Sequence, residues 1–279
     1  MLDKHTPIAT EIAEPISPFD DPECLYVPMP EGMRTFSSPS LHDWRQVPRG
    51  KTLLSRLANG LNTSLKAQES EVIDLSDYPL DTQNFVEQVL GEGEISILAD
   101  AVGERLNIAE SVFTGVWVVK YFQNGNLKHY YLEAGSYPSI LADWSASKNS
   151  PPPLPEAFLA ELMNAPALVH EIFTKATQFS PGSEEIINLT LLPMTSEDTQ
   201  FLVEWLGLAG ISILARGYGD CQISRTLLPN VWWVQYFNST GQLILNTLEI
   251  TALPSVVMAA PEDLEDSLIR LEEVLAGMD

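Results

Sequence analysis

Residues 95–99 read Ile-Ser-Ile-Leu-Ala, and residues 211–215 read Ile-Ser-Ile-Leu-Ala again. A longer pair keeps nearly the same spacing: Val-Trp-Val-Val-Lys-Tyr-Phe at 116–122 matches Val-Trp-Trp-Val-Gln-Tyr-Phe at 231–237. The second member of each pair lies 116 or 115 positions after the first. A repeat at a near-constant spacing indicates two copies of one folding unit, and this determines the architecture before any single element is assigned.

Both copies show the same order of elements, with strands predicted from alternating apolar residues and helices from apolar residues three and four positions apart. In the first copy we expect helices at 52–65 and 81–91 and strands at 72–75, 94–99, 105–114, 115–122 and 126–133. In the second copy we expect helices at 155–163, 166–178, 196–206 and 261–276 and strands at 185–191, 211–215, 221–227, 230–237 and 242–250. Tight turns such as Asn124-Gly125 join antiparallel strands. The predicted fold class is therefore α+β: two tandem copies of an α+β unit, each a mostly antiparallel sheet covered by helices.

Proline content and the repeat divide the chain into four segments. Residues 1–48 hold 8 of the 20 prolines and show no sustained period, which predicts an extended N-terminal arm. We expect the first repeat unit at 49–145 and the second at 154–279. The segment between them, 146–153, reads Ala-Ser-Lys-Asn-Ser-Pro-Pro-Pro and predicts a short linker stiffened by proline.

Charge and cysteine content exclude several classes of function. The chain has 279 residues and carries 15 Lys and Arg against 38 Asp and Glu, a net charge of −23. Such a surface disfavours nucleic acid and anionic membranes and suits a basic partner. No apolar run approaches the roughly 20 residues of a membrane span, and the first residues do not form a secretory signal. Two cysteines exclude a disulfide framework, so we expect a cytoplasmic protein without membrane insertion.

The two copies differ most in one loop. The first copy reads Leu-Ala-Asp-Ala-Val-Gly-Glu-Arg at 98–105, whereas the second reads Leu-Ala-Arg-Gly-Tyr-Gly-Asp-Cys at 214–221. The candidate partner-binding residues of this region are Arg216, Gly217, Tyr218, Gly219, Cys221 and Arg225. Glycine allows close backbone approach and arginine binds carboxylates, so the loop is suited to an anion or a peptide carboxylate. The alternative is a tight connection between strands with structural arginines.

Cys221 is the candidate nucleophile or redox thiol. A reactive thiol needs a nearby base, and none of the four histidines falls in the matched strands of the second copy. Cysteine is also among the most often buried residues, so an inert thiol in the core is the alternative. No pair of histidines has a spacing typical of a metal site. We therefore expect no metal, no cofactor and no catalytic constellation.

Trp232, Trp233 and Tyr236 lie in the most aromatic strand. Alternation places Trp232 and Tyr236 on one face of the sheet and Trp233 on the other. One face must pack against helices, and the other is a candidate partner-binding surface because it is also rich in apolar area. The alternative is a sheet covered on both faces by internal packing.

Several of these motifs together resemble the HupH/HyaF family of hydrogenase expression and formation proteins. They are Asn-Leu-Thr-Leu-Leu-Pro at 188–193, Ile-Ser-Ile-Leu-Ala-Arg-Gly-Tyr-Gly-Asp-Cys at 211–221, Asn-Val-Trp-Trp-Val-Gln-Tyr-Phe-Asn-Ser at 230–239, and Leu-Asn-Thr-Leu-Glu-Ile at 245–250 followed by Pro254. Tyr-Val-Pro-Met-Pro at 26–30 fits as well. The resemblance runs from about residue 24 to the end and is strongest in the second copy.

The resemblance implies an accessory protein that is not an enzyme and acts in maturation of an uptake [NiFe]-hydrogenase. It implies an assembly chaperone that binds the precursor of the iron–sulfur small subunit before twin-arginine export, alongside a thioredoxin-like accessory protein. Two alternatives from the residues remain at this stage. One is a thiol-based redox factor using Cys221, and the other is a small-ligand or iron–sulfur-handling module at the Arg216–Cys221 loop. In each case the second copy is expected to be the working half.

Overall fold

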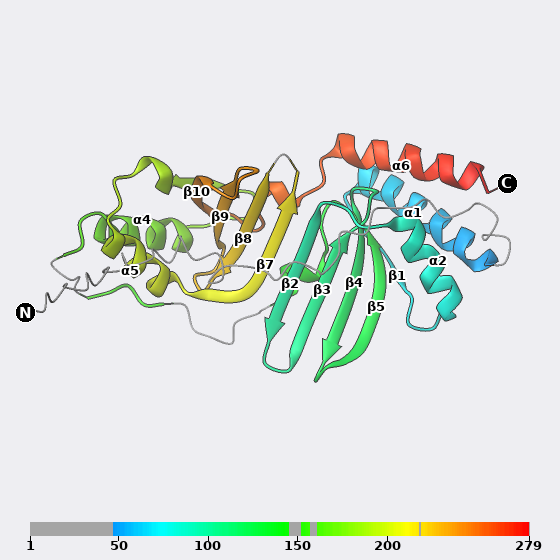
Figure 1. The fold of residues 1–279 in the computed structure, drawn as a ribbon, viewed down its shortest axis with the longest axis horizontal. Helices are drawn as coiled ribbons and strands as arrows, with labels where there is room; N and C mark the ends of the chain where they lie inside the picture. The colour runs from blue at the N-terminus through cyan, green and yellow to red at the C-terminus, as the bar shows by residue number, and fades with distance from the viewer. Residues whose placement is uncertain (1–46, 145–151, 157–160, 218, 279) are drawn as a thin grey trace, which may run out of the picture.

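The computed structural model describes residues 47–144, 152–156, 161–217 and 219–278, and it confirms the α+β fold class. The strands form one ten-stranded antiparallel sheet in the order β1-β5-β4-β3-β2-β7-β8-β9-β10-β6 (Figure 1). The strands are β1 (Glu71–Asp74), β2 (Ile95–Ala101), β3 (Glu104–Glu110), β4 (Val116–Gln123), β5 (Asn126–Ala134), β6 (Glu185–Asn188), β7 (Leu208–Arg216), β8 (Asp220–Thr226), β9 (Val231–Phe237) and β10 (Leu243–Ile250). The helices are α1 (Pro48–Ala67), α2 (Leu80–Leu90), α3 (Ile140–Asp143), α4 (Ala165–Thr177), α5 (Ser196–Leu206) and α6 (Pro261–Ala276), with short 3-10 helices η3 (Leu189–Leu191) and η4 (Ser255–Val257).

The repeated pentapeptide joins the two copies, because it pairs with its own second occurrence. β2 and β7 run antiparallel, and Ile97 lies opposite Ile213, its counterpart in the repeat. On either side, Ile95 lies opposite Ala215 and Ala99 lies opposite Ile211. The equivalent residues are thus exchanged about the Ile97–Ile213 pair, as in a pseudo-two-fold arrangement. The sheets of the two copies form one continuous sheet, not two separate ones.

Helices cover one face of the sheet in each half. We call the described residues up to 144 unit one and those from 152 onward unit two. In unit one, α1 and α2 pack on the strands through a core that includes Leu53 and Val86. In unit two, α4 and α5 do the same through Ile172 and Leu202. The opposite face carries a third core that spans both units, with Trp117 and Trp232 among its members, and it is closed by α3 and η4.

The C-terminal helix α6 leaves the second sequence copy and packs against α1 of unit one (Figure 1). Its buried Leu264 and Leu271 belong to the core of unit one. Gly115 makes this approach possible, since a Cβ at that position would lie 2.1 Å from Leu264 Cδ2. The end of the second copy thus completes the core of the first.

Local signals account for several element ends. Thr195 and Asp198 form a capping box at the start of α5, and Gly207 ends that helix as expected. The strand expected at 185–191 ends at Asn188, where η3 begins, because a 3-10 turn occupies the last three positions.

A helix is expected at 155–163, but residues 155, 156 and 161–163 are not helical in the structure. Residues 157–160 lie outside the described residues. The expected N-terminal arm falls almost entirely outside them as well, as does most of the linker. Among the residues described, no helix combines the length and apolar content needed to cross a membrane.

Candidate functional site

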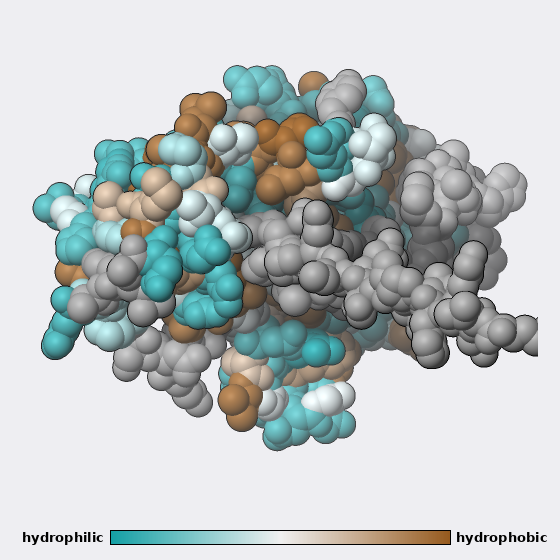
Figure 2. All heavy atoms as spheres, turned by 60° about the vertical axis from the view of Figure 1, so that its left-hand side comes forward, coloured by the Kyte–Doolittle hydropathy of each residue, from teal (hydrophilic) through white to brown (hydrophobic). Residues whose placement is uncertain are grey.

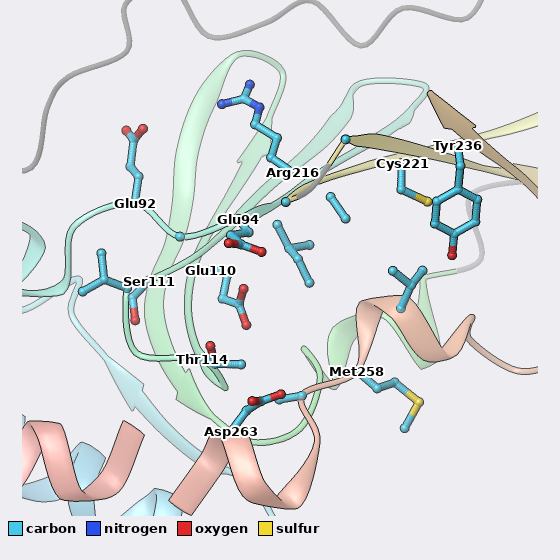
Figure 3. Close-up of a pocket in the computed structure, with 18 of the residues that line it drawn as sticks. Glu92, Glu94, Glu110, Ser111, Thr114, Arg216, Cys221, Tyr236, Met258 and Asp263 are labelled. Atoms are coloured by element: carbon cyan, nitrogen blue, oxygen red, sulfur yellow. The ribbon is translucent and has the colours of Figure 1, made fainter. Parts of the chain in front are cut away.

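The loop between β7 and β8 forms one side of a cleft at the junction of the two units (Figure 3). The cleft has a volume of about 850 Å³. Unit one contributes the start of β2 and the end of β3, and unit two contributes the β7–β8 loop, the end of β9 and α6. The pairing of β2 with β7 brings these parts together, because it sets Arg216 beside the entry to β2. The Arg216 backbone N–H donates to the Glu94 carbonyl oxygen at 2.9 Å.

Four carboxyl groups line this cleft, and they come from Glu92, Glu94, Glu110 and Asp263. Figure 3 shows the groups of Glu94, Glu110 and Asp263 turned toward the same space. Glu110 is only 4% exposed and accepts a hydrogen bond from the Gly115 N–H at 3.2 Å. Burial raises the pKa of Glu110 to about 7, with further increases from the charges of Glu94 and Asp263. A cation entering the cleft would stabilise the ionised form of this carboxyl group.

Arg216 lies next to Glu94 at the edge of the cleft, with its guanidinium turned away from the carboxyl groups of Glu110 and Asp263 (Figure 3), and among the described residues it has no carboxylate within ion-pair distance. Its counterpart in the first copy, Asp100, forms an ion pair with Arg105 at 2.7 Å. In unit two the residue opposite Arg216 is Asp220 in β8, but among the described residues no ion pair joins the two side chains. The Arg216 guanidinium is therefore available to a carboxylate or a backbone carbonyl of a bound segment.

The two glycines of the loop have different roles. A Cβ at Gly219 would lie 2.3 Å from the Phe237 carbonyl oxygen, so the close approach of β8 to β9 requires glycine there. A Cβ at Gly217 would meet only Glu94 Oε2 at 3.5 Å, an ordinary contact. Tyr218 lies outside the described residues.

Apolar side chains form another part of the cleft, including Tyr236, Ile244 and Met258, and Arg270 of α6 also lines it. Ile244 is 55% exposed and Met258 is 42% exposed, so this wall is open to a partner. Figure 2, in which the end of the molecule bearing unit two comes forward, shows apolar residues in several separate clusters among polar ones. The cleft thus combines one acidic wall with one apolar wall.

Cys221 lies behind the apolar wall and is buried. Burial raises the pKa of its thiol to about 12; a hydrogen bond with Tyr236 lowers it, and the charge of Glu249 raises it further. The thiol is therefore protonated at neutral pH and is a poor nucleophile. In the part of the chain that the structure describes, no group of three or more His, Cys, Asp or Glu side chains is arranged to hold a metal ion.

The structure separates the remaining candidates from the cleft. Trp232 and Trp233 are buried, and their indole N–H groups donate to the Thr251 carbonyl oxygen at 3.2 Å and to Asn246 Oδ1 at 2.6 Å. Trp232 and Trp233 lie in the cores on the two faces of the sheet. Here both faces are covered by internal packing, which was the alternative to a partner-binding face. Arg225 lies in a different pocket, described below.

Sequence reasoning missed the acidic wall. Glu110 had a visible signal, because the spacing of 115 that relates Trp117 to Trp232 aligns Glu110 with Arg225, so the two copies carry opposite charges at this strand position. Asp263 had none, because the pattern of α6 does not indicate which unit that helix covers. The acidic wall therefore depends on contacts between segments far apart in the sequence.

Comparison with known proteins assigns the family. The conserved C-terminal region of HupH hydrogenase expression proteins matches residues 47–143 and 162–278, one match for each unit. The chain is 38% identical over 283 residues to the hydrogenase expression/formation protein HoxQ of Cupriavidus necator, covering 96% of both chains. It is 37% identical over 262 residues to HupQ of Azotobacter chroococcum mcd 1, covering 91% of this chain and 92% of the relative. A solved structure, the hydrogenase expression protein HupH from Thiobacillus denitrificans, covers 40% of this chain and 95% of its own, with 26% identity and a TM-score of 0.39. The resemblance stated from the sequence is thus confirmed, and the chain belongs to the HupH family of hydrogenase expression/formation proteins.

Proposed function

We propose that this chain is an assembly chaperone in the maturation of an uptake [NiFe]-hydrogenase. In this proposal it works in the cytoplasm without catalysis and holds the precursor of the iron–sulfur small subunit before twin-arginine export, alongside a thioredoxin-like accessory protein. Its relatives are named hydrogenase expression/formation proteins, which supports a role in hydrogenase maturation. The precursor, the accessory protein and the compartment follow from the family resemblance and are part of the proposal.

The observation that carries the proposal is the cleft at the junction of the units. A twin-arginine leader presents guanidinium groups followed by an apolar stretch. The cleft offers carboxyl groups from Glu92, Glu94 and Asp263 next to an apolar wall containing Ile244 and Met258. The cleft is therefore complementary to such a leader in both charge and polarity. The net charge of −23 would also attract a basic segment from a distance and speed its association.

The other two hypotheses find less support at this site. A redox factor needs an accessible thiolate, whereas the Cys221 thiol is buried and has a raised pKa. Iron–sulfur clusters are held mainly by cysteine thiolates, and Cys221 is the single cysteine among the described residues. Neither hypothesis explains the acidic wall of the cleft.

Co-purification of the tagged chain with the co-expressed small-subunit precursor tests the proposal. We expect the precursor to be recovered, and a precursor lacking its leader to be recovered at least about 10-fold less. The double variant Glu92→Lys/Glu94→Lys should lower recovery of the full precursor by a similar factor. A matched control, Glu272→Lys/Glu273→Lys, makes the same change of charge at exposed positions of α6 outside the cleft lining and should leave recovery unchanged. If wild-type chain recovers no precursor, the proposal is wrong.

A second comparison asks whether the cleft is the working site. Arg216→Ala should impair hydrogenase maturation while leaving the fold intact, because Arg216 makes no ion pair among the described residues. Asp100→Ala, the matched change in the first copy, removes only an exposed ion pair with Arg105 and should leave maturation normal. Hydrogenase activity in cells that carry each variant gives the readout. Equal effects of the two substitutions would contradict the assignment of the cleft.

A further inference from the structure

Arg225 is a charged side chain that lies half-buried without a counter-charge. It lies in β8 on the same face as Cys221, and it projects into the core shared by both units. Its guanidinium donates one hydrogen bond, to the Trp144 carbonyl oxygen at 3.0 Å, and lies 5.7 Å from the centre of the Trp232 ring. Among the described residues, no carboxylate lies within ion-pair distance of it. Burial alone lowers the pKa of Arg225, with no contribution from a neighbouring charge.

Such an arrangement is costly unless something offsets it. A guanidinium has five N–H donors and remains charged in proteins, and the Trp144 carbonyl oxygen is the one hydrogen-bond acceptor of Arg225 among the described residues. Removing a charge from water without a partner of opposite sign is unfavourable. The aromatic face of Trp232 offsets part of this cost through a cation–π contact. A carboxylate ligand would offset the rest with two parallel hydrogen bonds.

Arg225 lines a pocket that is separate from the β7–β8 loop and has a volume of about 440 Å³. This volume lies within the range of small-ligand sites, roughly 300–1,000 Å³. The apolar wall comes from Leu141 in α3 and from Trp232 and Leu253 in unit two. Ser183 and Ser255 add hydroxyl groups, and the exposed Glu184 adds a carboxylate to the lining but forms no ion pair with Arg225, so polar and apolar surfaces converge as in ordinary ligand sites.

The site belongs to the second copy alone. Arg225 lies opposite Trp232 as Glu110 lies opposite the matching Trp117, so unit one carries a carboxyl group where unit two carries this guanidinium. The pocket nevertheless needs both units, because α3 of unit one forms one of its walls. A ligand there would contact both halves of the molecule.

We propose that this pocket binds a carboxylate attached to an apolar group of about the size of an amino-acid side chain, with Arg225 holding the carboxylate. The chemistry fits either a small free carboxylic acid or the C-terminal residue of a polypeptide. The pocket does not include the acidic cleft, apart from a shared Met258 at its edge, and the inference stands without the proposed chaperone function.

Titration of the full chain with N-acetyl-L-leucine, followed by NMR at the Arg225 side chain and the Trp232 indole, tests the proposal. The uncharged N-acetyl-L-leucinamide is the matched probe. We expect the acid to bind about 10–100-fold more tightly than the amide, as for a charge-assisted pair of hydrogen bonds. Equal binding of acid and amide, or no shift with the acid up to ~10 mM, would overturn the proposal.

Two variants assign the effect to Arg225. Arg225→Met keeps the apolar stem and should abolish the preference for the acid, whereas Arg105→Met, which removes an exposed arginine of unit one, should preserve it. Arg225→Lys keeps the charge but loses the planar fork, so it should weaken acid binding about 10-fold. If Arg225→Met does not fold, an unchanged affinity in Arg225→Lys refutes the role of the guanidinium.

A further titration distinguishes the two sources of the carboxylate. A pentapeptide ending in leucine should bind more tightly than N-acetyl-L-leucine if the pocket takes a polypeptide C-terminus. It should bind more weakly if the pocket takes a free small acid. Binding of neither probe overturns the proposal in both forms.

Discussion

Replacement of Glu110 by glutamine should remove a large part of the pH dependence of stability. Glu110 is buried at the end of β3, and burial raises its pKa to about 7 from an ordinary value of 4.5. The folded state therefore binds a proton that the unfolded state releases between about pH 4.5 and pH 7. The contribution is fully present below the unfolded pKa and is lost as the pH rises through the folded pKa. The difference of about 2.5 pKa units corresponds to about 3 kcal/mol of unfolding free energy, as an upper value.

Glutamine is neutral at every pH in this range, and its side-chain oxygen still accepts the hydrogen bond from the Gly115 N–H. The unfolding free energy of Glu110→Gln minus that of wild type should therefore rise between pH 5 and pH 8 and then level off. Urea denaturation at several pH values measures this difference, and the many other carboxyl groups largely cancel because both proteins carry them. Glu92→Gln is the matched control, since Glu92 is an exposed carboxyl of the same cleft, and its difference should stay below about 0.5 kcal/mol.

A direct titration checks the same reasoning without unfolding. The side-chain carboxyl carbon of Glu110, followed by NMR, should titrate near pH 7 in the wild-type chain. Asp263→Asn should lower this midpoint, because the charge of Asp263 contributes to the raised pKa. If Glu110 titrates near 4.5, or if wild type and Glu110→Gln lose stability in parallel from pH 5 to pH 8, the account of a buried protonated carboxyl is refuted.

Three further outcomes are expected. In a Cys24→Ser background, the Cys221 thiol should react with a thiol reagent at pH 8 only as fast as the chain unfolds, because it is buried with a pKa of about 12; rapid labelling without denaturant would contradict this. Trp232→Ala should lower the unfolding free energy by about 4 kcal/mol in urea denaturation, because it removes a buried indole and its hydrogen bond to Thr251. Asp198→Asn should cost about 2 kcal/mol at pH 7, because backbone N–H groups donate to the buried carboxylate; a cost below 0.5 kcal/mol would show that the charge is not needed. Burial raises the Asp198 pKa, but these N–H groups lower it by more, so the net shift is downward and the difference from wild type should shrink below about pH 4.

Most elements of this fold follow from local patterns in the sequence. The Asn124-Gly125 turn, the Gly207 stop after α5 and the alternation in 231–237 each act within a few residues, and each is found as expected. Alternation also assigns Trp232 and Trp233 to opposite faces, but it does not tell whether a face is covered. The covering segments, α3 and η4, are too short to give a periodic signal of their own.

The cleft depends on contacts that no local pattern encodes. Glu94 and Arg216 are more than one hundred residues apart and meet only because β2 pairs with β7. Asp263 joins them because α6 crosses to unit one, and the apolar stripe of α6 would suit either unit equally well. The sequence could therefore point to the loop at Arg216 but not to the carboxyl groups of the cleft beside it.

The repeat itself explains why the two copies must differ. Two identical strands that pair antiparallel present the same residues to each other. The pentapeptide at 95–99 and its copy at 211–215 therefore form both sides of one strand pairing. Such a pairing creates two equivalent ends, one at Asp100 and one at Arg216. The single C-terminal helix α6 lines only the Arg216 end. At the Asp100 end Asp100 forms an exposed ion pair with Arg105, whereas the end beside α6 becomes an open acidic cleft, where Arg216 forms no ion pair among the described residues. The asymmetry of the loops thus follows from the asymmetry of what covers them.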